Sequence, residues 1–418
     1  MFADTLIHQV AARAARRNLS FSPSAGMAGL PQPDTGRRYL LYLHIPFCVT
    51  LCPFCSFHRV RFKEERARHY FAALEREIAL AADAGFRFSE VYFGGGTPTV
   101  LPDQLFALIR KLRDDYAVRQ VSAETNPDDI RDAVLDKIAG AGINRLSVGV
   151  QSFDDALLRQ MQRYEKYGSG DVISKRLRNA QHRFDTLNVD MIFNLPSQSA
   201  ASLLRDLRIL TDEVGATQVS WYPLMTAPST RKSMEQSMGR SDFAREREFY
   251  EMISEHMLGR GYVRSTAWCF SRGQALIDEY ITDNDEYLGL GSGAFSYIDG
   301  SVFGSTFSIN HYLERIGAGK SGITRVQKLG RSDQRRYWLL MNLFAGSIRY
   351  SEIPRPYRAA LRAEIAGLRL IGAARRDGEC LKLTERGYYL WVVLMGEFFT
   401  GVNEFRERMR LEIPNEIQ

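Results

Sequence analysis

The chain has 418 residues, enough for two domains or for one large domain with an appendage. Its composition, 45% hydrophobic and 25% charged, is ordinary for a soluble globular protein, and it contains no run of about 18 apolar residues that would predict a membrane span. The formal net charge of +6 falls on residues 325–418, where 17 Lys and Arg stand against 11 Asp and Glu. Such a segment is either a solvated face or a contact for an anionic cofactor, a carboxylate-rich substrate or nucleic acid.

We expect residues 1–37 to form an N-terminal arm and linker. A possible amphipathic helix is followed by a stretch rich in Pro, Gly and Ser at 22–36, a composition typical of linkers. Three arginines in the first 20 residues resemble a transit peptide, but Asp4 and the amphipathic pattern argue against one. The N-terminus also has no apolar core of the signal-peptide type, so we expect a cytoplasmic protein.

The central part of the chain, residues 38–320, alternates between short apolar segments and amphipathic ones. Strands are expected at 39–45, 89–95, 120–127, 143–152, 186–196 and 217–224, and helices at 63–84, 103–115, 128–141, 154–163 and 202–215. Strands that alternate with helices of this length predict βαβ units and a parallel sheet. The expected fold class is therefore α/β, as a partial or complete parallel barrel, with a doubly wound open sheet as the alternative.

Residues 325–418 have a different pattern. Segment 361–391 reads as helix, short strand, turn, strand and helix. This predicts a small C-terminal, winged-helix-like domain. On its own it would favour DNA binding, in which a basic surface supplies non-specific affinity. We keep that as a minor hypothesis, and a nucleic-acid partner is not expected.

Three of the five cysteines lie within eight residues. Cys48, Cys52 and Cys55 have the spacing C-x3-C-x2-C directly after the first strand, whereas Cys269 and Cys380 stand alone. Five cysteines so placed do not form a disulfide framework, and such a group indicates a metal or catalytic site. Thiolates bind iron–sulfur clusters, usually four per cluster, so a cubane held by three leaves one iron open. An open coordination position makes a metal centre reactive.

The neighbours of the cysteines bear on which metal is bound. Phe47, Phe54 and Phe57 are apolar and would shield a cluster and tune its potential. The alternative is a zinc site completed by His44 or His58. Zinc ligands commonly come in two separated pairs, and here they form one group.

The cysteine motif after a first strand resembles the signature of radical S-adenosylmethionine (SAM) enzymes. The segment HIPFC, with Phe54 before the third cysteine, is similar to the branch that contains oxygen-independent coproporphyrinogen III oxidase, its haem-chaperone relatives and the class C radical SAM methyltransferases. The resemblance covers roughly residues 39–320 and implies that 38–320 is a catalytic domain of the radical SAM barrel type. It further implies a [4Fe–4S] cluster on the three cysteines, with Phe54 beside the cofactors and SAM chelated on the open iron.

The same resemblance implies where SAM is held. Gly94, Gly95, Gly96 and Thr97 follow a strand and resemble the segment that holds the amino group of SAM. Glycines at a strand end let backbone approach a ligand closely, although a run of three glycines can also be a simple turn.

Polar residues at later strand ends complete the expected SAM site. By the resemblance, Glu124 contacts the amino-acid part of SAM and Arg163 its carboxylate, a strong and directional pairing. Gln151 and Asp190 face the ribose. Taken singly, each of these residues could equally be a helix cap or a surface pair.

A second SAM is also implied. Tyr42 matches a ligand-contacting tyrosine of the coproporphyrinogen enzyme, or is a core aromatic, and Tyr42 and Glu124 are the candidates for catalytic roles. Segment 287–300 resembles the glycine-rich segment that closes the family's active site, and its Phe295 stands where that enzyme has an aliphatic residue contacting a second SAM. Phe57 stands where that enzyme has a fourth cysteine, which brings the chain closer to the haem-chaperone and methyltransferase branches.

Three functions stay open. The first is a radical SAM enzyme acting on a tetrapyrrole, by porphyrinogen oxidation or haem modification, with an electron donor such as flavodoxin or ferredoxin. The second is a class C methyltransferase or cyclopropanase acting on another planar unsaturated compound. The third is a haem-binding trafficking protein. Segment 265–284 matches none of the family patterns, and its Trp268 and Cys269 lie either in the core or near the substrate.

Overall fold

The computed structural model describes residues 22–23, 29–225, 231, 234–236, 239, 242–273 and 286–411. Most of the expected N-terminal arm and residues 274–284 of the unmatched segment lie outside this set. Among the described residues, no helix is both long and apolar enough to cross a bilayer.

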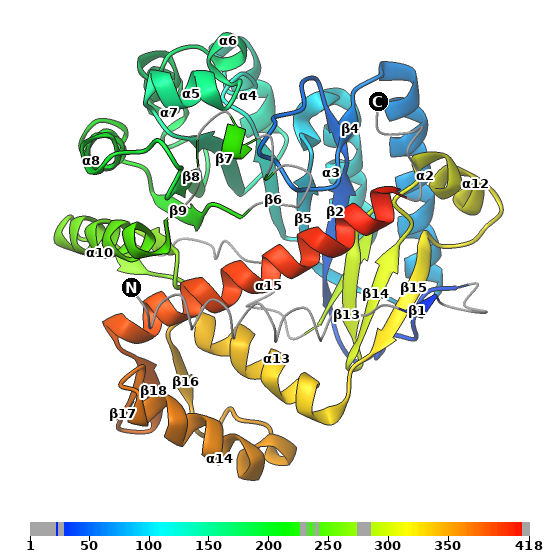
Figure 1. Ribbon diagram of the computed structural model, residues 1–418. Helices are drawn as coiled ribbons and strands as arrows, with labels where there is room; N and C mark the ends of the chain where they lie inside the picture. The colour runs from blue at the N-terminus through cyan, green and yellow to red at the C-terminus, as the bar shows by residue number, and fades with distance from the viewer. Residues whose placement is uncertain are drawn as a thin grey trace.

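A curved sheet of parallel strands forms the centre of the molecule (Figure 1). Each strand pairs in parallel with its successor in the chain. In order, they are β2 (Tyr39–Ile45), β5 (Phe88–Gly95), β6 (Gln120–Thr125), β7 (Arg145–Gln151), β8 (Thr186–Phe193) and β9 (Gln218–Pro223). All six predicted strands are confirmed. Their spatial order follows the chain order without reversal, which is the order of a barrel and not of a doubly wound sheet.

Further strands extend the sheet on both sides. Beside β2 lie β12 (Tyr287–Leu290), which is parallel to it, and then the antiparallel strands β13 (Phe295–Ile298), β14 (Ser301–Ser305), β15 (Ile323–Lys328) and β1 (Ser22–Pro23). Beside β9 lie β11 (Cys269–Ser271) and β10 (Val263–Arg264), both antiparallel. In the described part of the chain β1 and β10 are the two edges and do not pair with each other, so the barrel is partial.

Helices cover the outer side of the sheet (Figure 1). They are α2 (Glu64–Asp83), α3 (Pro102–Tyr116), α4 (Asp132–Gly140), α5 (Asp155–Gln160), α6 (Tyr164–Tyr167), α7 (Gly170–Ala180), α8 (Ala200–Arg208) with its π-helical extension η2 (Ile209–Val214), α10 (Phe243–Gly259) and α12 (Ile309–Gly317). The prediction of a single helix over 154–163 is wrong at its C-terminal end. The chain leaves the helix after Gln160, because Gln162 has a φ of 56°, and Arg163 then precedes α6.

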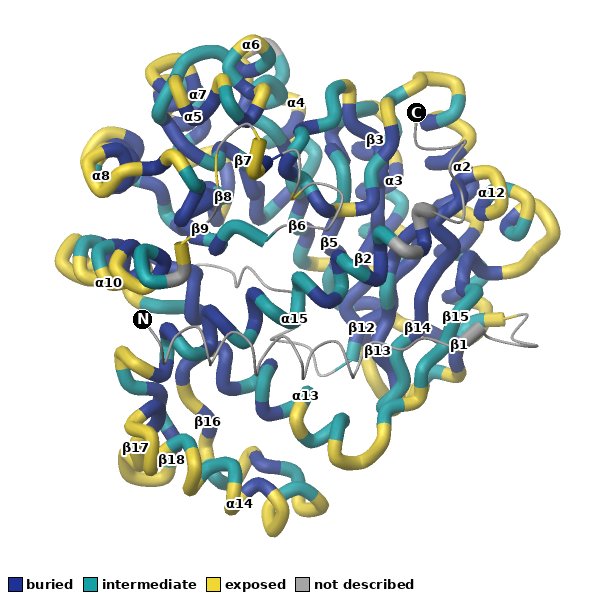
Figure 2. The backbone as a smooth tube through the Cα atoms, viewed as in Figure 1, coloured by how far each residue is buried: buried dark blue, intermediate teal, exposed yellow. Residues whose placement is uncertain are grey.

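The first strand of the barrel, β2, is almost entirely apolar. All seven residues of β2 are buried, as expected for a parallel strand covered on both sides (Figure 2).

The buried carboxylate of Glu77, on α2, holds the segment that follows β12 and the residues before β15. It accepts hydrogen bonds from the backbone amides of Gly291 at 2.8 Å and Gly322 at 2.6 Å, and from the Tyr312 hydroxyl at 2.8 Å. Burial raises the pKa of Glu77, and these three donors act in the opposite direction.

The C-terminal elements match the predicted winged-helix-like pattern. They are α13 (Arg331–Phe344), β16 (Ser347–Arg349), α14 (Arg355–Leu370), β17 (Ala374–Asp377), β18 (Cys380–Leu383) and α15 (Glu385–Leu411). The three strands form one antiparallel sheet in the order β16–β18–β17. Figure 1 shows α15 leaving this unit and running back across the inner side of the barrel.

Trp268 belongs to the core that joins α15 to the barrel. Its ring centroid lies 4.8 Å from that of Phe344 on α13, 5.9 Å from Phe399 on α15 and 5.3 Å from Tyr222 on β9. Its side chain is fully buried. Cys269 is also fully buried, on β11 opposite Ser220 of β9. Of the two roles left open for this pair, the structure supports core packing.

Replacing Trp268 with Ala should lower the free energy of unfolding by about 3–5 kcal/mol, since a buried indole leaves a cavity between three elements. Chemical denaturation monitored by circular dichroism measures this loss. Leu370→Ala is the control, because Leu370 is 89% exposed, and it should change stability by no more than about 0.5 kcal/mol. A Trp268 variant as stable as the parent would contradict the packing role.

Candidate active site

The three clustered cysteines occupy a loop that two short strands close. Cys48 ends β3 (Phe47–Cys48), which pairs with β4 (Val60–Arg61) after the loop. Cys52 and Cys55 share a turn in which the Cys55 amide donates to the Cys52 carbonyl at 3.2 Å. Cys48 and Cys52 are each 8% exposed, Cys55 is half-buried, and none forms a disulfide. The loop is thus held at both ends, with its sulfurs near the surface of the core.

Hydrogen-bond donors point at the sulfurs. An Arg163 Nη1–H donates to Cys52 Sγ at 3.5 Å, and the Thr97 hydroxyl lies 3.5 Å from Cys48 Sγ. Donors to sulfur stabilise thiolates and raise the potential of a cluster they hold. Burial raises the pKa of Cys48 to about 11, so a metal must displace its proton on binding. These features fit a cluster held by thiolates.

The zinc alternative does not fit His44, one of the two histidines that could complete such a site. His44 Nε2 lies 2.9 Å from the carbonyl of His58, which can only accept, so Nε2 carries the proton. In neutral His44 the other nitrogen, Nδ1, then accepts from the Tyr42 hydroxyl at 2.9 Å. Both nitrogens of His44 are therefore engaged within the protein. Across the described residues, no three His, Cys, Asp or Glu side chains converge tightly enough to hold one ion. A cubane takes each thiolate on a different iron and tolerates a wider spacing.

The glycine segment at the end of β5 packs directly against the start of the cysteine loop. The amide of Gly96 donates to the Ile45 carbonyl at 2.8 Å, and that of Thr97 to the Phe47 carbonyl at 2.8 Å. A Cβ on Gly96 would lie 2.7 Å from the Phe47 carbonyl oxygen, and one on Gly95, which has a φ of 118°, would lie 2.7 Å from the His44 ring. Gly96 therefore lets the backbone approach the cysteine loop, and Gly95 lets it approach His44 of β2. The expected contact of this segment with SAM stays a prediction.

Glu124, at the end of β6, holds this segment from the other side. Its Oε2 accepts from the Gly95 amide at 3.0 Å, and its Oε1 accepts from the Tyr92 hydroxyl at 3.0 Å. Tyr92 in turn stacks on Tyr42 with ring centroids 6.0 Å apart. A Cβ on Gly94 would touch both Tyr42 and Glu124. Burial, then the charge of Glu124, raises the pKa of Tyr42 far above its usual range, so this phenol stays protonated.

Arg163 lies among three strand ends. Its guanidinium donates to the Gly149 carbonyl on β7 and to Asn126 Oδ1 at 3.4 Å, in addition to the Cys52 sulfur. Asn126 also donates to the Thr97 hydroxyl at 2.9 Å, so the glycine segment and Arg163 share one network. Arg163 is 3% exposed, and within the described part of the chain its Nε has no hydrogen-bond partner. A buried N–H donor that has no acceptor in the described part of the protein is suited to bind an anionic ligand.

The other two predicted SAM contacts lie at different depths in the barrel. Gln151 is the last residue of β7 and has a φ of 77° next to an irregularity in the pairing of β7 with β8, which turns the chain at the strand end. Asp190 lies three residues before the end of β8. Its Oδ2 accepts from the Ser147 hydroxyl at 2.7 Å and its Oδ1 from the Asn188 amide at 2.7 Å. Asp190 is thus part of a polar network inside the barrel.

The predicted aromatic residues have distinct surroundings. Phe54 is 9% exposed and belongs to the main core, whereas Phe57 is 46% exposed, so shielding of the loop comes from Phe47 and Phe54 more than from Phe57. Phe295 packs against α15, with its ring centroid 5.8 Å from that of Phe405 and 6.2 Å from that of Phe307.

Sequence reasoning missed several residues of this region. Asn126 joins Thr97 to Arg163, and its place two residues after Glu124 at a strand end was a usable signal. Tyr167 contacts two cations, with Arg163 Cζ 4.5 Å and Lys166 Nζ 4.6 Å from its ring centroid. Nothing in the local sequence indicated that Arg406, at the far end of the chain, lies 5.1 Å from the Phe57 ring.

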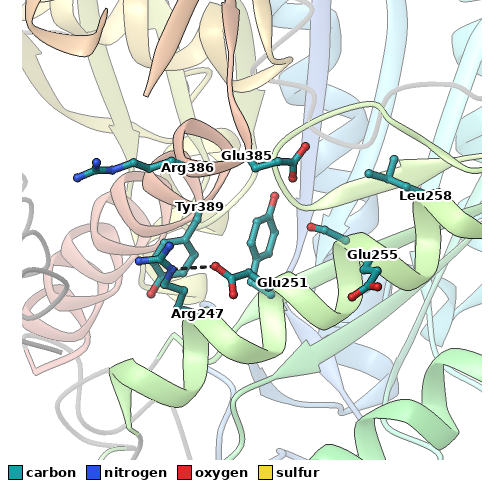
Figure 3. Close-up of a pocket in the computed structure, with 9 residues that line it drawn as sticks. Arg247, Glu251, Glu255, Leu258, Glu385, Arg386 and Tyr389 are labelled. Carbon is teal, nitrogen blue, oxygen red and sulfur yellow. Dashed lines mark hydrogen bonds and ion pairs between the residues drawn. The ribbon is translucent and has the colours of Figure 1, made fainter. Parts of the chain in front are cut away.

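A separate pocket of about 360 Å³ lies between α10 and the start of α15 (Figure 3). It contains none of the predicted site residues. The side chains that line it are Arg247, Tyr250, Glu251, Ser254, Glu255, Leu258, Glu385, Arg386 and Tyr389.

Comparisons with known proteins agree on the family. Residues 42–210 match the family model of the radical SAM superfamily. The chain is 30% identical over 287 residues to the haem chaperone HemW of Bacillus subtilis, covering 66% of this chain and 75% of the relative. It is 29% identical over 373 residues to anaerobilin synthase of Escherichia coli O157:H7, covering 86% and 83%.

A solved structure shares the fold. Coproporphyrinogen III oxidase (HemN) from Escherichia coli superposes with a TM-score of 0.72 over 86% of this chain and 90% of the other, at 24% identity. The expected partial barrel of the radical SAM type is therefore confirmed. On the cysteine loop, the glycine segment packed on it and these matches together, the chain belongs to the radical SAM superfamily, in the branch of coproporphyrinogen III oxidase and the haem chaperones, and its cofactors are a [4Fe–4S] cluster and SAM.

Proposed function

We propose that this radical SAM enzyme acts on a tetrapyrrole, by modifying haem or by oxidising a porphyrinogen. The observation that carries the proposal is how much of the chain aligns with one relative. Anaerobilin synthase aligns over 86% of the chain, beyond the barrel alone, and its name is that of an enzyme that makes a bilin. Bilins are linear tetrapyrroles. Coproporphyrinogen III oxidase of Bradyrhizobium diazoefficiens, 25% identical over 73% of the chain, is named for another tetrapyrrole.

The proposal assigns the cluster to Cys48, Cys52 and Cys55. When bound and reduced, the cluster supplies one electron that splits SAM into methionine and a 5′-deoxyadenosyl radical, which takes a hydrogen atom. The protein holds the three thiolates, directs the Arg163 guanidinium at one of them and buries the loop on Phe47 and Phe54. Exclusion of water from such a site suppresses side reactions. The electron donor we propose is a flavodoxin or ferredoxin.

The proposal assigns SAM to the strand ends around Arg163. The spare Nε–H of Arg163 binds the SAM carboxylate, and Glu124 contacts the ammonium group while it holds Gly95. Gln151 and Asp190 face the ribose. Tyr42, kept protonated by burial, contacts the reacting ligands from β2.

Haem trafficking is the second candidate. The observation that favours it is the 30% identity to a protein named as a haem chaperone, which covers three quarters of that relative. Under this reading the same site binds cluster and SAM, but haem leaves the protein unchanged. A further version of the enzyme proposal is the transfer of a methyl or methylene group from a second SAM, held near Tyr42 and Phe295.

Anaerobically reconstituted protein should contain about four irons per chain. Cys48→Ala, Cys52→Ala and Cys55→Ala should each abolish cluster binding, because each removes one of only three thiolates. Iron analysis and the visible absorption of the cluster measure this. Cys269→Ala and Cys380→Ala are the matched controls and should keep full iron. A Cys52 variant with full iron content would rule out the assignment.

Arg163→Ala should weaken SAM binding by about 1.5–3 kcal/mol, the contribution of a charge-assisted hydrogen bond. Anaerobic equilibrium dialysis with labelled SAM measures the affinity, and iron analysis on the same sample separates SAM loss from cluster loss. The control is Arg159→Ala, four residues earlier, whose guanidinium packs on Tyr164. SAM affinity equal to that of the parent would remove Arg163 from the site.

Turnover with haem or a porphyrinogen and methyl-labelled SAM should give 5′-deoxyadenosine together with a changed tetrapyrrole. Mass spectrometry of the products distinguishes the outcomes, with S-adenosylhomocysteine measured alongside. Label in the product indicates methyl or methylene transfer, and unlabelled product with carbon dioxide release indicates porphyrinogen decarboxylation. Stoichiometric haem binding without any new product would contradict the enzyme proposal and favour trafficking.

A further inference from the structure

The turn after β7 lies beside two proposed SAM contacts, Gln151 and Arg163. Gln151 is the last residue of β7, and its side chain turns back over Gly149. A Cβ on Gly149 would lie 3.0 Å from the Gln151 Nε2 atom and 3.9 Å from the Arg163 Nη2 atom, and the Arg163 guanidinium also donates to the Gly149 carbonyl. The two side chains therefore lie close together over one strand end.

The backbone of Gln151 has an uncommon conformation. Its φ of 77° is in the left-handed region, where the Cβ of any residue other than glycine crowds the chain. The pairing of β7 with β8 is also irregular between Gly149 and Gln151. Such a conformation persists only where the surrounding structure holds it. The residues directly after Gln151 must therefore be fixed by other parts of the fold.

A fully buried carboxylate on α8 fixes these residues. Asp206 accepts a hydrogen bond from the Ser152 hydroxyl at 2.7 Å through Oδ2, and from the Phe153 amide at 2.9 Å through Oδ1. Ser152 is fully buried as well. Burial raises the pKa of Asp206 to about 7, and the two hydrogen bonds act in the opposite direction. Both oxygens of the carboxylate are thus bonded to the two residues that follow Gln151.

The far side of the turn is held separately. Ser152 Oγ accepts from the Asp154 amide at 3.0 Å, and Asp154 Oδ1 accepts from two amides in the first turn of α5 and so caps this helix. A Cβ on Gly170 would lie 1.9 Å from the Phe153 carbonyl oxygen, so the start of α7 packs closely on the turn. The cap fixes the residues after the turn, and the α8 carboxylate fixes the two residues next to Gln151.

We propose that Asp206 is a positioning residue for SAM, which acts through Gln151 and does not itself touch the ligand. It holds the backbone turn in which the Gln151 side chain lies over Gly149, beside Arg163. This inference rests on the proposed assignment of Gln151 and Arg163 to SAM, and it adds the residue of α8 that sets the direction of Gln151. It gives Asp206 no part in holding the cluster.

The test is a double-mutant cycle on SAM affinity, measured by equilibrium dialysis of the anaerobically reconstituted protein. Gln151→Ala and Asp206→Ala should each weaken SAM binding by about three- to tenfold, the range for one hydrogen bond. The double variant should bind SAM as Gln151→Ala alone does, because Asp206 acts through Gln151. A general loss of stability would instead lower the affinity by the same factor in both backgrounds. Iron analysis of each sample shows whether the cluster is retained.

Further variants separate the positioning role from the packing of α8. Ser152→Ala removes one of the two donors to Asp206, so it should weaken SAM binding less and should also have no effect in the Gln151→Ala background. If Asp206→Ala does not fold, this second cycle decides in its place. Asp206→Asn keeps an oxygen for the Phe153 amide and should bind SAM more tightly than Asp206→Ala. Leu207→Ala is the matched control, because it removes the next, fully buried side chain of α8 and neither hydrogen bond, and it should leave SAM affinity unchanged.

The positioning role would be overturned if Asp206→Ala or Ser152→Ala weakened SAM binding equally in the parent and in the Gln151→Ala background. Unchanged affinity in a folded Asp206→Ala protein would overturn it too. A Gln151→Ala variant that binds SAM as the parent does would instead contradict the assignment of Gln151 to SAM, and the inference would fall with it. The failure of the inference alone and the failure of the proposed SAM site are therefore distinguishable.

Discussion

The rest of the site depends on the backbone contact between the glycine segment and the cysteine loop. Two amides, of Gly96 and Thr97, donate to carbonyls on either side of Pro46, and the approach is so close that any side chain at position 96 would meet backbone. A loop carrying three thiolates has no regular structure of its own to fix it. Pinning its first residues to the next strand of the sheet fixes where Cys48 begins the turn, and every other contact to the sulfurs builds on that position.

From this contact a continuous set of hydrogen bonds spreads over the strand ends. Glu124 holds Gly95 from β6, Asn126 links Thr97 to Arg163, and Arg163 reaches back to Cys52. The elements β2, β5, β6 and β7 each contribute to it. Removing any one member would leave its buried partners without hydrogen bonds, which lowers the stability of the folded protein. The members of the network therefore depend on one another. The cysteine loop and Arg163 are therefore positioned by contacts with the sheet.

Much of this architecture could be predicted from local sequence, and the limits have physical reasons. The six parallel strands were recognisable because each is a short apolar run next to an amphipathic helix, and the cysteines because their spacing is local. The break after Gln160 was not visible, because left-handed backbone at Gln162 leaves no compositional signal. The contact of Asp190 with Ser147 was not visible either, because it depends on the register of β7 against β8. The contact of Arg406 with Phe57 joins residues near opposite ends of the chain, which no local pattern encodes.

The long path of α15 has a consequence for how the protein is made. Phe57 leaves the ribosome well before Arg406, which follows it by 349 residues in the chain. At about 5–20 residues per second, tens of seconds separate the two events. During that interval the barrel strands can form before α15 reaches Phe57, so the cysteines proposed to hold the cluster are accessible to whatever delivers iron and sulfide. Arrival of α15 then brings Arg406 against Phe57, and the order of synthesis separates the period before this contact from the period after it.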